Sequence, residues 1–325
     1  MDDTAEAGAP PARGVRTAWG SVPARVRAAV EGRLGARVVR ARTQSAGFSP
    51  GVAARLGLAD GRRVFVKAVS AAQNPESPGI HRDEVRIARA LPAAVPAPRL
   101  LADLDLDGWV VLLFEDVEGR LPALPWEPAE LDLVLGAVGD LAAVLTPSPV
   151  AVPPVAQRQE SAFRGWRVLS ADHAAGTDDL AGLDPWAARN LPALAELESG
   201  WAAGAAGGTL AHADLRADNL LLTPDGRVVV VDWPWACLAA PWYDLLLMLP
   251  SVRMQGGPPP ERLFAAHRAA AGADPDAVTA VLAAFAGYLL GHARRPAPPG
   301  LPTLRAFQAA QGREALAWLR ARLGE

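Results

Sequence analysis

Several residue types are scarce in this chain of 325 residues, and each scarcity excludes something. A single cysteine, Cys237, rules out an internal disulfide. The net charge is only -3, which provides no basic surface of the kind that binds nucleic acid. The longest uncharged helical run, 277–291, is rich in alanine and falls short of a bilayer span, and residues 1–6 are acidic where a signal peptide would be basic. We therefore expect a cytoplasmic protein that binds neither nucleic acid nor membrane, and the sequence leaves its oligomeric state open.

The scarcest charged residue is lysine, which occurs once beside thirty-one arginines. The one lysine, Lys67, lies in an alternating stretch at 64–69 that is typical of a strand. A compact ammonium group makes a point contact to phosphate oxygens that a wide, planar guanidinium cannot copy. This favours a chemical role for Lys67. The alternative is chance survival on a solvated strand, where arginine and lysine often exchange.

The composition along the chain predicts two lobes. Residues 1–20 are rich in Ala, Gly, Pro and Asp, which is typical of a disordered leader. Residues 21–114 form the predicted N-terminal lobe, and the polar segment 115–119, which ends in glycine, is a predicted hinge. From 120 to 325 the sequence favours long helices rich in Ala and Leu, which predicts a helical C-terminal lobe.

Turn dipeptides predict two hairpins in the first lobe, at Asp60-Gly61 and Asp107-Gly108. A helix is predicted before them, over 23–34, and another between them, over 81–91, where Glu84 shares a face with Ala88 and Leu91. The predicted strands of the hairpins are 52–58, 63–69, 100–106 and 109–114.

One β element interrupts the helical lobe: residues 219–222, a turn at 223–226, and residues 227–232. A lone hairpin is marginally stable by itself, so we expect this one to present functional residues. Asp214 and Asn219 precede or begin the hairpin, and Asp232 ends it. Oxygen ligands in this small number suit Mg²⁺, which prefers one or two carboxylates together with substrate phosphates.

In these features the chain resembles the aminoglycoside phosphotransferase family of small-molecule kinases, which has a protein-kinase-like fold. The resemblance covers roughly residues 35–250, with five features in the family's order: Lys67 on a strand, Glu84 on the next helix, a hinge, an HxDxxxxN loop at 212–219, and Asp232 after the hairpin. It implies an α+β bilobed fold, with a small antiparallel sheet and one helix in the first lobe and a larger, mainly helical second lobe that carries the inserted hairpin.

The resemblance also implies roles for these residues. Asp214 would orient the substrate hydroxyl and accept its proton, while Asn219 and Asp232 would hold Mg²⁺ on the nucleotide phosphates. Lys67, paired with Glu84, would bind the α- and β-phosphates of ATP, with GTP as a possible replacement.

Further residues are expected at the site on the same resemblance. Arg216 is placed to touch the transferring phosphoryl group, although a salt bridge to Asp218 is an open alternative. The turn 44–51 would be the loop over the phosphates, and hinge backbone would contact the nucleotide base. The expected contacts in the loop and hinge are Gly47, Ser49, Gly51, Glu115 and Val117.

Other residues near the motifs are expected to be structural. His212 would brace the catalytic loop, and Asp244 would tie it down. The chain also departs from the family pattern: the phosphate loop lacks GxGxxG and contains Pro50, which has no backbone N–H.

A different enzyme class also matches part of the sequence. Residues 47–51 read GFSPG, the GxSxG pattern in which Ser49 would be the nucleophile of a serine hydrolase. That elbow needs a strand, a turn and a helix, and an N–H on the residue after the serine. Because that residue is Pro50 and the surroundings predict strands, the pattern disfavours a hydrolase.

Two readings within the same fold remain. A protein kinase would need a long activation segment, yet only eleven residues separate Asp232 from Asp244. A nucleotide-binding module without turnover is the other alternative, and the complete set of Lys, Asp and Asn argues against it. The small-molecule acceptor stays open: residues 145–200 carry seven acids against four arginines, but residues 251–325 carry nine arginines against five acids. An aminoglycoside, another hydroxylated antibiotic such as a macrolide, a sugar and an amino alcohol are all compatible with this, and antibiotic resistance is one possible role.

Overall fold

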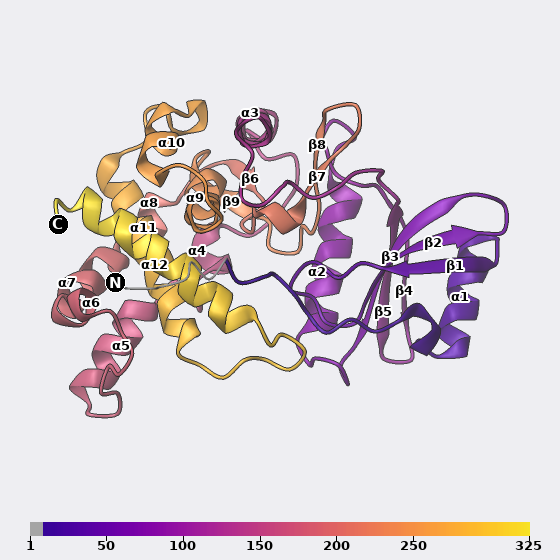
Figure 1. Ribbon diagram of the computed structural model, residues 1–325, viewed down its shortest axis with the longest axis horizontal. Helices are drawn as coiled ribbons and strands as arrows, with labels where there is room; N and C mark the ends of the chain where they lie inside the picture. The colour runs from indigo at the N-terminus through magenta and orange to yellow at the C-terminus, as the bar shows by residue number, and fades with distance from the viewer. Residues whose placement is uncertain (1–8) are drawn as a thin grey trace, which may run out of the picture.

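The computed structural model describes residues 9–325, which form two lobes (Figure 1). One lobe is built on an antiparallel sheet and the other mainly on helices. The α+β bilobed fold predicted from the sequence is therefore confirmed.

The first lobe is a five-stranded antiparallel sheet in the order β1-β2-β3-β5-β4, with a helix on each face. Both predicted hairpins form, around the two expected turns. The strands are β1 (Val38–Thr43), β2 (Val52–Leu58), β3 (Arg63–Ser70), β4 (Leu100–Leu106) and β5 (Trp109–Glu115).

Alternation along β3 decides which side chains meet which helix. Val64, Val66 and Ala68 are buried in the cluster that includes α1 (Ala24–Leu34). Phe65 packs on the other face, against the cluster that includes Val85 of α2 (Ser77–Ala90). Because side chains at every second position of a strand share a face, Lys67 projects on the α2 side.

The edge strand β1 was not predicted. Five of its six residues are exposed and it carries two arginines, so it lacks the alternation of buried and exposed positions that marks a half-buried strand. Its position is set by pairing with β2, in which Ala41 lies opposite Leu56.

The second lobe contains most of the helices and two short ribbons. The predicted hairpin is β7 (Leu220–Leu222) with β8 (Val228–Val230), and an unpredicted ribbon joins β6 (Thr209–Ala211) to β9 (Cys237–Ala239). Strands of three residues are too short to give a periodic signal, and β6 and β9, unlike β7 and β8, are not joined by a short turn that would mark them. The helices are α3 (Pro128–Val144), α4 (Val155–Arg158), α5 (Gly165–Ala174), α6 (Pro185–Arg189), α7 (Leu191–Ser199), α8 (Trp201–Gly204), α9 (Tyr243–Met254), α10 (Pro260–Ala266), α11 (Pro275–Ala293) and α12 (Leu304–Arg322).

Helix α11 corrects one expectation from the sequence. At 19 residues it is long and apolar enough to cross a membrane, whereas the alanine-rich run was expected to fall short. In the structure it lies inside the helical lobe, where Val281, Leu282 and Ala283 are fully buried against neighbouring helices. Burial of this kind is typical of the core helix of a globular domain.

The predicted disordered leader is wrong for residues 9–20. This segment forms β-bridges at Arg13 and Arg16, and a short 3-10 helix, Trp19–Ser21, buries Trp19. Almost every residue type carries a backbone N–H and C=O that can pair. The composition of this stretch, rich in Ala, Gly and Pro, therefore gave no sign that its backbone is paired. Residues 1–8 of the predicted leader lie outside the described part of the chain.

The segment after β5 is tied directly to the inserted hairpin. Arg120 N–H donates to the Leu222 carbonyl at 3.0 Å, and Leu222 N–H donates to the Arg120 carbonyl at 2.7 Å. Residues of the predicted hinge region are thereby held against β7. These two bonds tie the inserted hairpin to the chain that leaves the sheet of the first lobe.

Candidate active site

Lys67 is the centre of a charged contact between the lobes. Its Nζ donates to both oxygens of Glu84, at 2.7 and 2.8 Å, and to Oδ1 of Asp232 at 2.7 Å. The Lys67 and Glu84 side chains are only 12% and 4% exposed. The predicted pair is therefore present, and the ammonium also reaches the residue that ends the hairpin in the other lobe.

Burial and charge act against each other in this cluster. Burial alone would lower the pKa of Lys67, but the carboxylates of Asp232 and Glu84 outweigh it and raise that pKa. Burial raises the pKa of Glu84, although Lys67 opposes the rise. For Asp232, the attraction of Lys67 outweighs burial and lowers the pKa to about 2. Lys67 and Asp232 are thus held in their charged forms near neutral pH.

The HxDxxxxN loop, residues 212–219 and called the catalytic loop below, brings Asp214 and Asn219 together. Asn219 Nδ2 donates to the Asp214 carbonyl at 2.7 Å and to Asp214 Oδ2 at 3.2 Å. The Asp214 carboxylate is 27% exposed. Burial raises its pKa to about 7; Arg216 opposes the rise, whereas Asp218 and Asp232 add to it.

Arg216 is engaged by two acids of the same loop. Its guanidinium donates to Asp214 Oδ1, and it also contacts both oxygens of Asp218 at 3.0 and 3.1 Å. The Arg216 Cζ atom lies 5.5 Å from the ring centroid of Phe48 and 5.8 Å from that of Phe307. The salt bridge to Asp218, left open by the sequence, is therefore present, while contact with a phosphoryl group stays a prediction.

Asp244 and His212 fix the backbone of the loop, as expected. Asp244 accepts hydrogen bonds from the N–H groups of His212 and Ala213, both at 2.7 Å. The fully buried His212 ring contacts the Val231 carbonyl through Nε2 at 3.0 Å and accepts from Asp214 N–H at 3.2 Å. Because burial lowers its pKa to about 4, this ring is neutral near pH 7.

Two residues of the site have strained backbone conformations. Ala213 has φ +65° and Asp232 has φ +70°, a region that non-glycine residues seldom occupy. Such positions persist where the surrounding contacts over-determine them, and they cluster at functional sites. Here Asp244 holds Ala213, and Lys67 holds Asp232.

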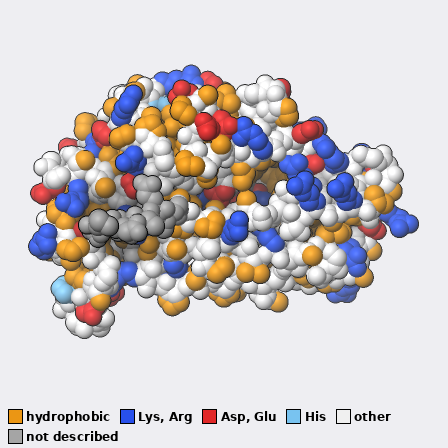
Figure 2. Space-filling view, viewed as in Figure 1, with side chains coloured by type: hydrophobic (Ala, Val, Ile, Leu, Met, Phe, Trp, Pro, Cys, Tyr) orange, Lys and Arg blue, Asp and Glu red, His pale blue; other side chains and the backbone are white. Residues whose placement is uncertain are grey.

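Some of these residues line a cleft of about 320 Å³ between the lobes, whereas Asp214 and Arg216 lie outside its lining. Lys67 and Glu84 line it from the first lobe, and Asn219 and Asp232 line it from the second. In Figure 2 the surface is hollowed between the lobes, with acidic atoms visible inside the hollow.

The oxygens that face the cleft fit a magnesium ion. One carboxylate and one amide oxygen, from Asp232 and Asn219, are hard ligands, and Mg²⁺ is normally completed by phosphate oxygens and water. Asn219 uses its Nδ2 within the protein, which leaves its amide oxygen for a ligand. Within residues 9–325, no group of three or more His, Cys, Asp or Glu side chains forms a closed metal cage.

Comparison with known families decides the class of this site. The model of the phosphotransferase enzyme family matches residues 45–281, which include the phosphate loop, Lys67, the catalytic loop and Asp232. The chain belongs to this family. The prediction of a phosphotransferase is therefore confirmed.

Solved structures share the fold of this phosphotransferase at low sequence identity. A thermostable mutant of aminoglycoside phosphotransferase APH(4)-Ia, in a ternary complex with ADP and hygromycin B, is 17% identical, with a TM-score of 0.61 over 91% of this chain and 98% of that chain. The choline kinase LicA from Streptococcus pneumoniae is 13% identical, with a TM-score of 0.59 over 91% of this chain and 98% of that one. A search of curated proteins by sequence gave no match.

A third similar structure contains a different nucleotide. It is the GDP and kanamycin complex of APH(2")-IIIa, which is 15% identical, with a TM-score of 0.55 over 93% of this chain and 99% of that chain. At these identities the likeness establishes the fold alone.

The phosphate loop of the phosphotransferase, residues 44–51, differs in part from expectation. Gly47 and Ser49 line the cleft, and Gly47 has φ +89°. Gly51, with φ +90°, lies against β3 instead: a Cβ there would be 2.5 Å from the Ala68 carbonyl oxygen. Gly51 is therefore required by packing on the sheet, and the expected close approach to phosphate is not the constraint at this position.

The surroundings of Ser49 do not form a nucleophile elbow. Its hydroxyl contacts the Pro50 carbonyl at 3.3 Å, and the loop is followed by β2 instead of a helix. A hydrolase requires a base beside the serine and the strand–turn–helix geometry. The serine hydrolase alternative is thus disfavoured by the structure as it was by the sequence.

At the hinge, Glu115 and Val117 line the cleft as expected. The sequence missed Arg55 of β2, which donates to the Val117 carbonyl at 3.2 Å and lies 3.3 Å from a carboxylate oxygen of Asp116. The available signal was an arginine inside a strand whose neighbours are buried. Arg55 ties the hinge backbone to the sheet.

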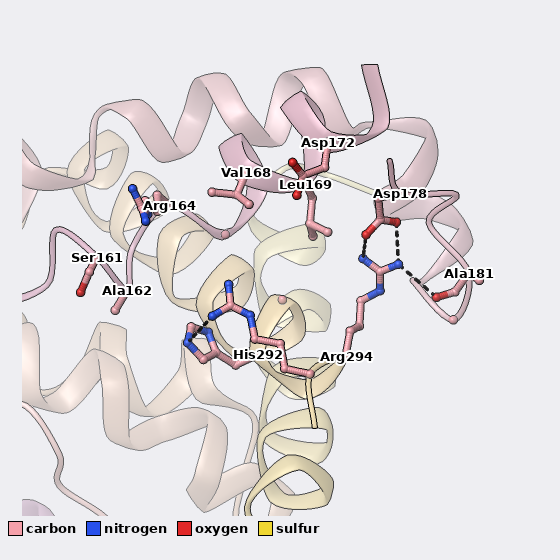
Figure 3. Close-up of a pocket in the computed structure, with 14 residues that line it drawn as sticks. Ser161, Ala162, Arg164, Val168, Leu169, Asp172, Asp178, Ala181, His292 and Arg294 are labelled. Carbon is pink, nitrogen blue, oxygen red and sulfur yellow. Dashed lines mark hydrogen bonds and ion pairs between the residues drawn. The ribbon is translucent and has the colours of Figure 1, made fainter. Parts of the chain in front are cut away.

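A second cavity, of about 490 Å³, opens in the helical lobe between α5 and the end of α11. Figure 3 shows Arg164 and Asp172 on its walls, and Arg294 paired with Asp178 through two bonds of 2.7 Å. His292, another lining residue, has its ring centroid 4.6 Å from that of Tyr288 one turn earlier in α11, with the two ring planes tilted by 52°. The cavity is lined by side chains of both charges.

Proposed function

We propose that this phosphotransferase moves the γ-phosphoryl group of ATP to a hydroxyl group of a small molecule, with Mg²⁺ as cofactor. The observation that carries the proposal is the contact of Lys67 with Asp232 across the lobes, with Asp214 and Asn219 on the adjoining loop. Positioning and charge neutralisation account for most of the catalysis of phosphoryl transfer, and this arrangement supplies both.

Each of the residues at the candidate active site has a specific task in the proposed reaction. Lys67, oriented by Glu84, binds phosphate oxygens of the nucleotide. Asn219 and Asp232 hold Mg²⁺, which when bound neutralises charge on the phosphate oxygens. Asp214 accepts the proton of the acceptor hydroxyl, and Asn219 and Arg216 orient its carboxylate.

The protonation states support these tasks. With a pKa of about 2, Asp232 is an anion at any working pH and can bind a cation. With a pKa of about 7, Asp214 can take up a proton during the reaction and release it afterwards. Environments that push the pKa values of two neighbouring carboxylates apart are typical of sites that divide binding and proton transfer between them.

The similar proteins support a purine nucleotide as the donor. ADP is bound in the hygromycin B complex, and AMP-PNP in another complex of that enzyme. GTP is the alternative donor, because the kanamycin complex contains GDP. Backbone groups at Glu115 and Val117 would contact the base.

The acceptor is proposed as a small hydroxylated compound, with an aminoglycoside-like antibiotic, a sugar and an amino alcohol as candidates. Similar proteins are named for hygromycin B, kanamycin and choline. Residues 145–200 carry seven acids against four arginines, but residues 251–325 carry nine arginines against five acids, so the charge of the helical lobe does not favour a strong polycation over a neutral or weakly charged molecule. A role in antibiotic resistance follows if an antibiotic proves to be the acceptor, and the proposed location is cytoplasmic.

The test is a panel of acceptors incubated with MgATP. Hygromycin B, kanamycin, choline, a macrolide and simple sugars would be assayed for ADP formation and for a product that has gained one phosphate. The Asp214→Asn variant should lose turnover because it cannot accept the proton, yet should still bind AMP-PNP. Nucleotide binding without transfer to any acceptor would support a binding module without turnover, and full activity of the variant would contradict the assigned base.

A further inference from the structure

An N-terminal strap, residues 12–17, runs beside the phosphate loop. Gly47 N–H donates to the Ala12 carbonyl at 3.0 Å, and Gly14 N–H donates back to the Gly47 carbonyl at 2.9 Å. Thr17 N–H then reaches the Gly51 carbonyl at 2.8 Å. The strap is thus paired to the loop along most of its length.

The other side of the strap is fixed by the C-terminal lobe. Val15 N–H donates to the Gly300 carbonyl at 2.8 Å, and the Thr303 hydroxyl donates to the Arg13 carbonyl at 3.1 Å. Gly14 lies so close to the loop that a Cβ there would be 2.7 Å from the Ser49 carbonyl oxygen. The strap is therefore held in place between the phosphate loop and the segment before α12.

The side chain of Arg16 extends from the strap to the cleft between the lobes. Its guanidinium donates to the carbonyls of Ser49 and Ala46, and it lines the cleft together with Lys67 and Asp232. Within residues 9–325, Asp232 and Asp218 act on this guanidinium through their charge without a hydrogen bond to it, and its buried Nε–H has no hydrogen-bond partner. Burial lowers the pKa of Arg16, and the acids Asp232 and Asp218 oppose the shift from nearby.

Two residues of the phosphate loop cannot donate a backbone N–H to a phosphate. Pro50 has no N–H, and the N–H of Gly47 is already used by Ala12. Phosphate loops normally bind through successive backbone N–H groups. A guanidinium presents five N–H donors in a fork that fits phosphate oxygens, and a buried cation without an anionic partner is costly.

We infer that Arg16 binds the β- and γ-phosphates of the nucleotide and compensates for the backbone donors missing at Gly47 and Pro50. The inference rests on the proposed function, since it requires a nucleoside triphosphate in the cleft. Lys67 approaches the cleft from β3, and Arg16 approaches it from the loop side. The N-terminal strap is thereby part of the nucleotide site.

The test compares AMP-PNP and AMP binding, each with Mg²⁺, by calorimetry on the full chain. The Arg16→Ala variant should bind AMP-PNP about tenfold to a hundredfold more weakly, as expected for the loss of hydrogen bonds to a charged group. Its affinity for AMP should be nearly unchanged, because AMP lacks the β- and γ-phosphates. Arg13→Ala is the matched control: this exposed arginine lies on the same strap, and its substitution should alter neither affinity.

Equal weakening of AMP and AMP-PNP would show that Arg16 only supports the loop and would overturn the inference, as would unchanged affinity for both. Arg16→Lys, which keeps the charge, guards against loss of folding and should show an intermediate loss for AMP-PNP alone. In the wild-type protein, the NMR signal of the Arg16 Nε–H, assigned by its loss in Arg16→Lys, should shift with AMP-PNP and stay in place with AMP. A wild-type protein that binds no nucleotide would sink the proposed function itself, whereas normal wild-type binding with an unaffected Arg16→Ala variant would sink only this inference.

Discussion

At the scale of single residues, the proposed base Asp214 has a carboxylate whose pKa is set by its surroundings. Its carboxylate accepts hydrogen bonds from Arg216 and Asn219, yet burial keeps its pKa at about 7. A general base is most effective when its pKa lies near the working pH. The surroundings of Asp214 are therefore matched to proton transfer near neutrality.

A pH profile follows from this value. Only the ionised carboxylate accepts a proton, so kcat/KM for the acceptor should be constant above a pH of about 7 and should fall roughly tenfold per unit below it. Asp232, with a pKa of about 2, stays ionised and should add no second acidic limb in this range. A profile that is flat down to pH 5 would refute Asp214 as the base.

The residues with the strongest chemical signal in the sequence are brought together by the structure, and their roles stay predictions. Lys67 was identified by its rarity, and Asp214, Asn219 and Asp232 by their spacing around a hairpin. Arg16 was missed: it is one arginine among thirty-one, and its position depends on backbone pairing between segments some thirty residues apart in the chain. Pairing of that kind leaves no local pattern.

At the scale of elements, the catalytic loop is held by a carboxylate on the first turn of α9. Asp244 accepts from two backbone N–H groups and so supports the strained Ala213. Burial raises the pKa of Asp244 to about 6, although both hydrogen bonds oppose the rise. The loop geometry therefore depends on an element that does not line the cleft between the lobes.

Removing this support should destabilise the protein. Asp244→Ala leaves two buried N–H groups without an acceptor and should lower the free energy of unfolding by about 2–5 kcal/mol. Asp244→Asn keeps one acceptor oxygen and should cost less. Urea unfolding would measure both, with Asp140→Ala as the control: this carboxylate is 74% exposed and pairs with Arg268 on the surface, so its loss should cost about 1 kcal/mol or less. An Asp244→Ala variant as stable as that control would contradict the assigned role.

Elements with their own local signal were predicted well. The hairpins β2–β3 and β4–β5 are marked by Asp-Gly turns between alternating residues, and their strands begin and end within a residue or two of the predicted limits. The strand β1 was missed because it is exposed, and β6 and β9 were missed because these three-residue strands are far apart in the sequence and have no turn between them like the one that marks β7 and β8. Their existence depends on a partner strand supplied by the fold.

At the scale of the whole molecule, an ion pair joins the two lobes at the cleft. Lys67 of the first lobe contacts Asp232 of the second, and the N-terminal strap lies between the phosphate loop and the segment before α12 (Figure 1). The inserted hairpin is bonded to the chain that leaves the sheet, through Arg120 and Leu222. A ligand with several negative charges in the cleft would therefore contact both lobes at once.

This arrangement predicts how nucleotides stabilise the chain. Mg·AMP-PNP should raise Tm more than AMP does, because its phosphates contact groups from both lobes. At equal concentration, a ligand that binds the folded state more tightly stabilises it more. Lys67→Ala should remove most of the difference. Equal shifts for the two ligands in the wild-type protein would indicate that the phosphates bind elsewhere.

The central claim is that one nucleoside triphosphate is bound by both lobes, by Lys67 of the first lobe and by Asn219 and Asp232 of the second. The most direct measurement is a crystal structure with AMP-PNP and Mn²⁺, in which anomalous scattering locates the metal. We predict a manganese peak on the oxygens of Asn219 and Asp232, with the phosphates between the metal and Lys67. A nucleotide bound outside this cleft, or a metal remote from both residues, would contradict the account.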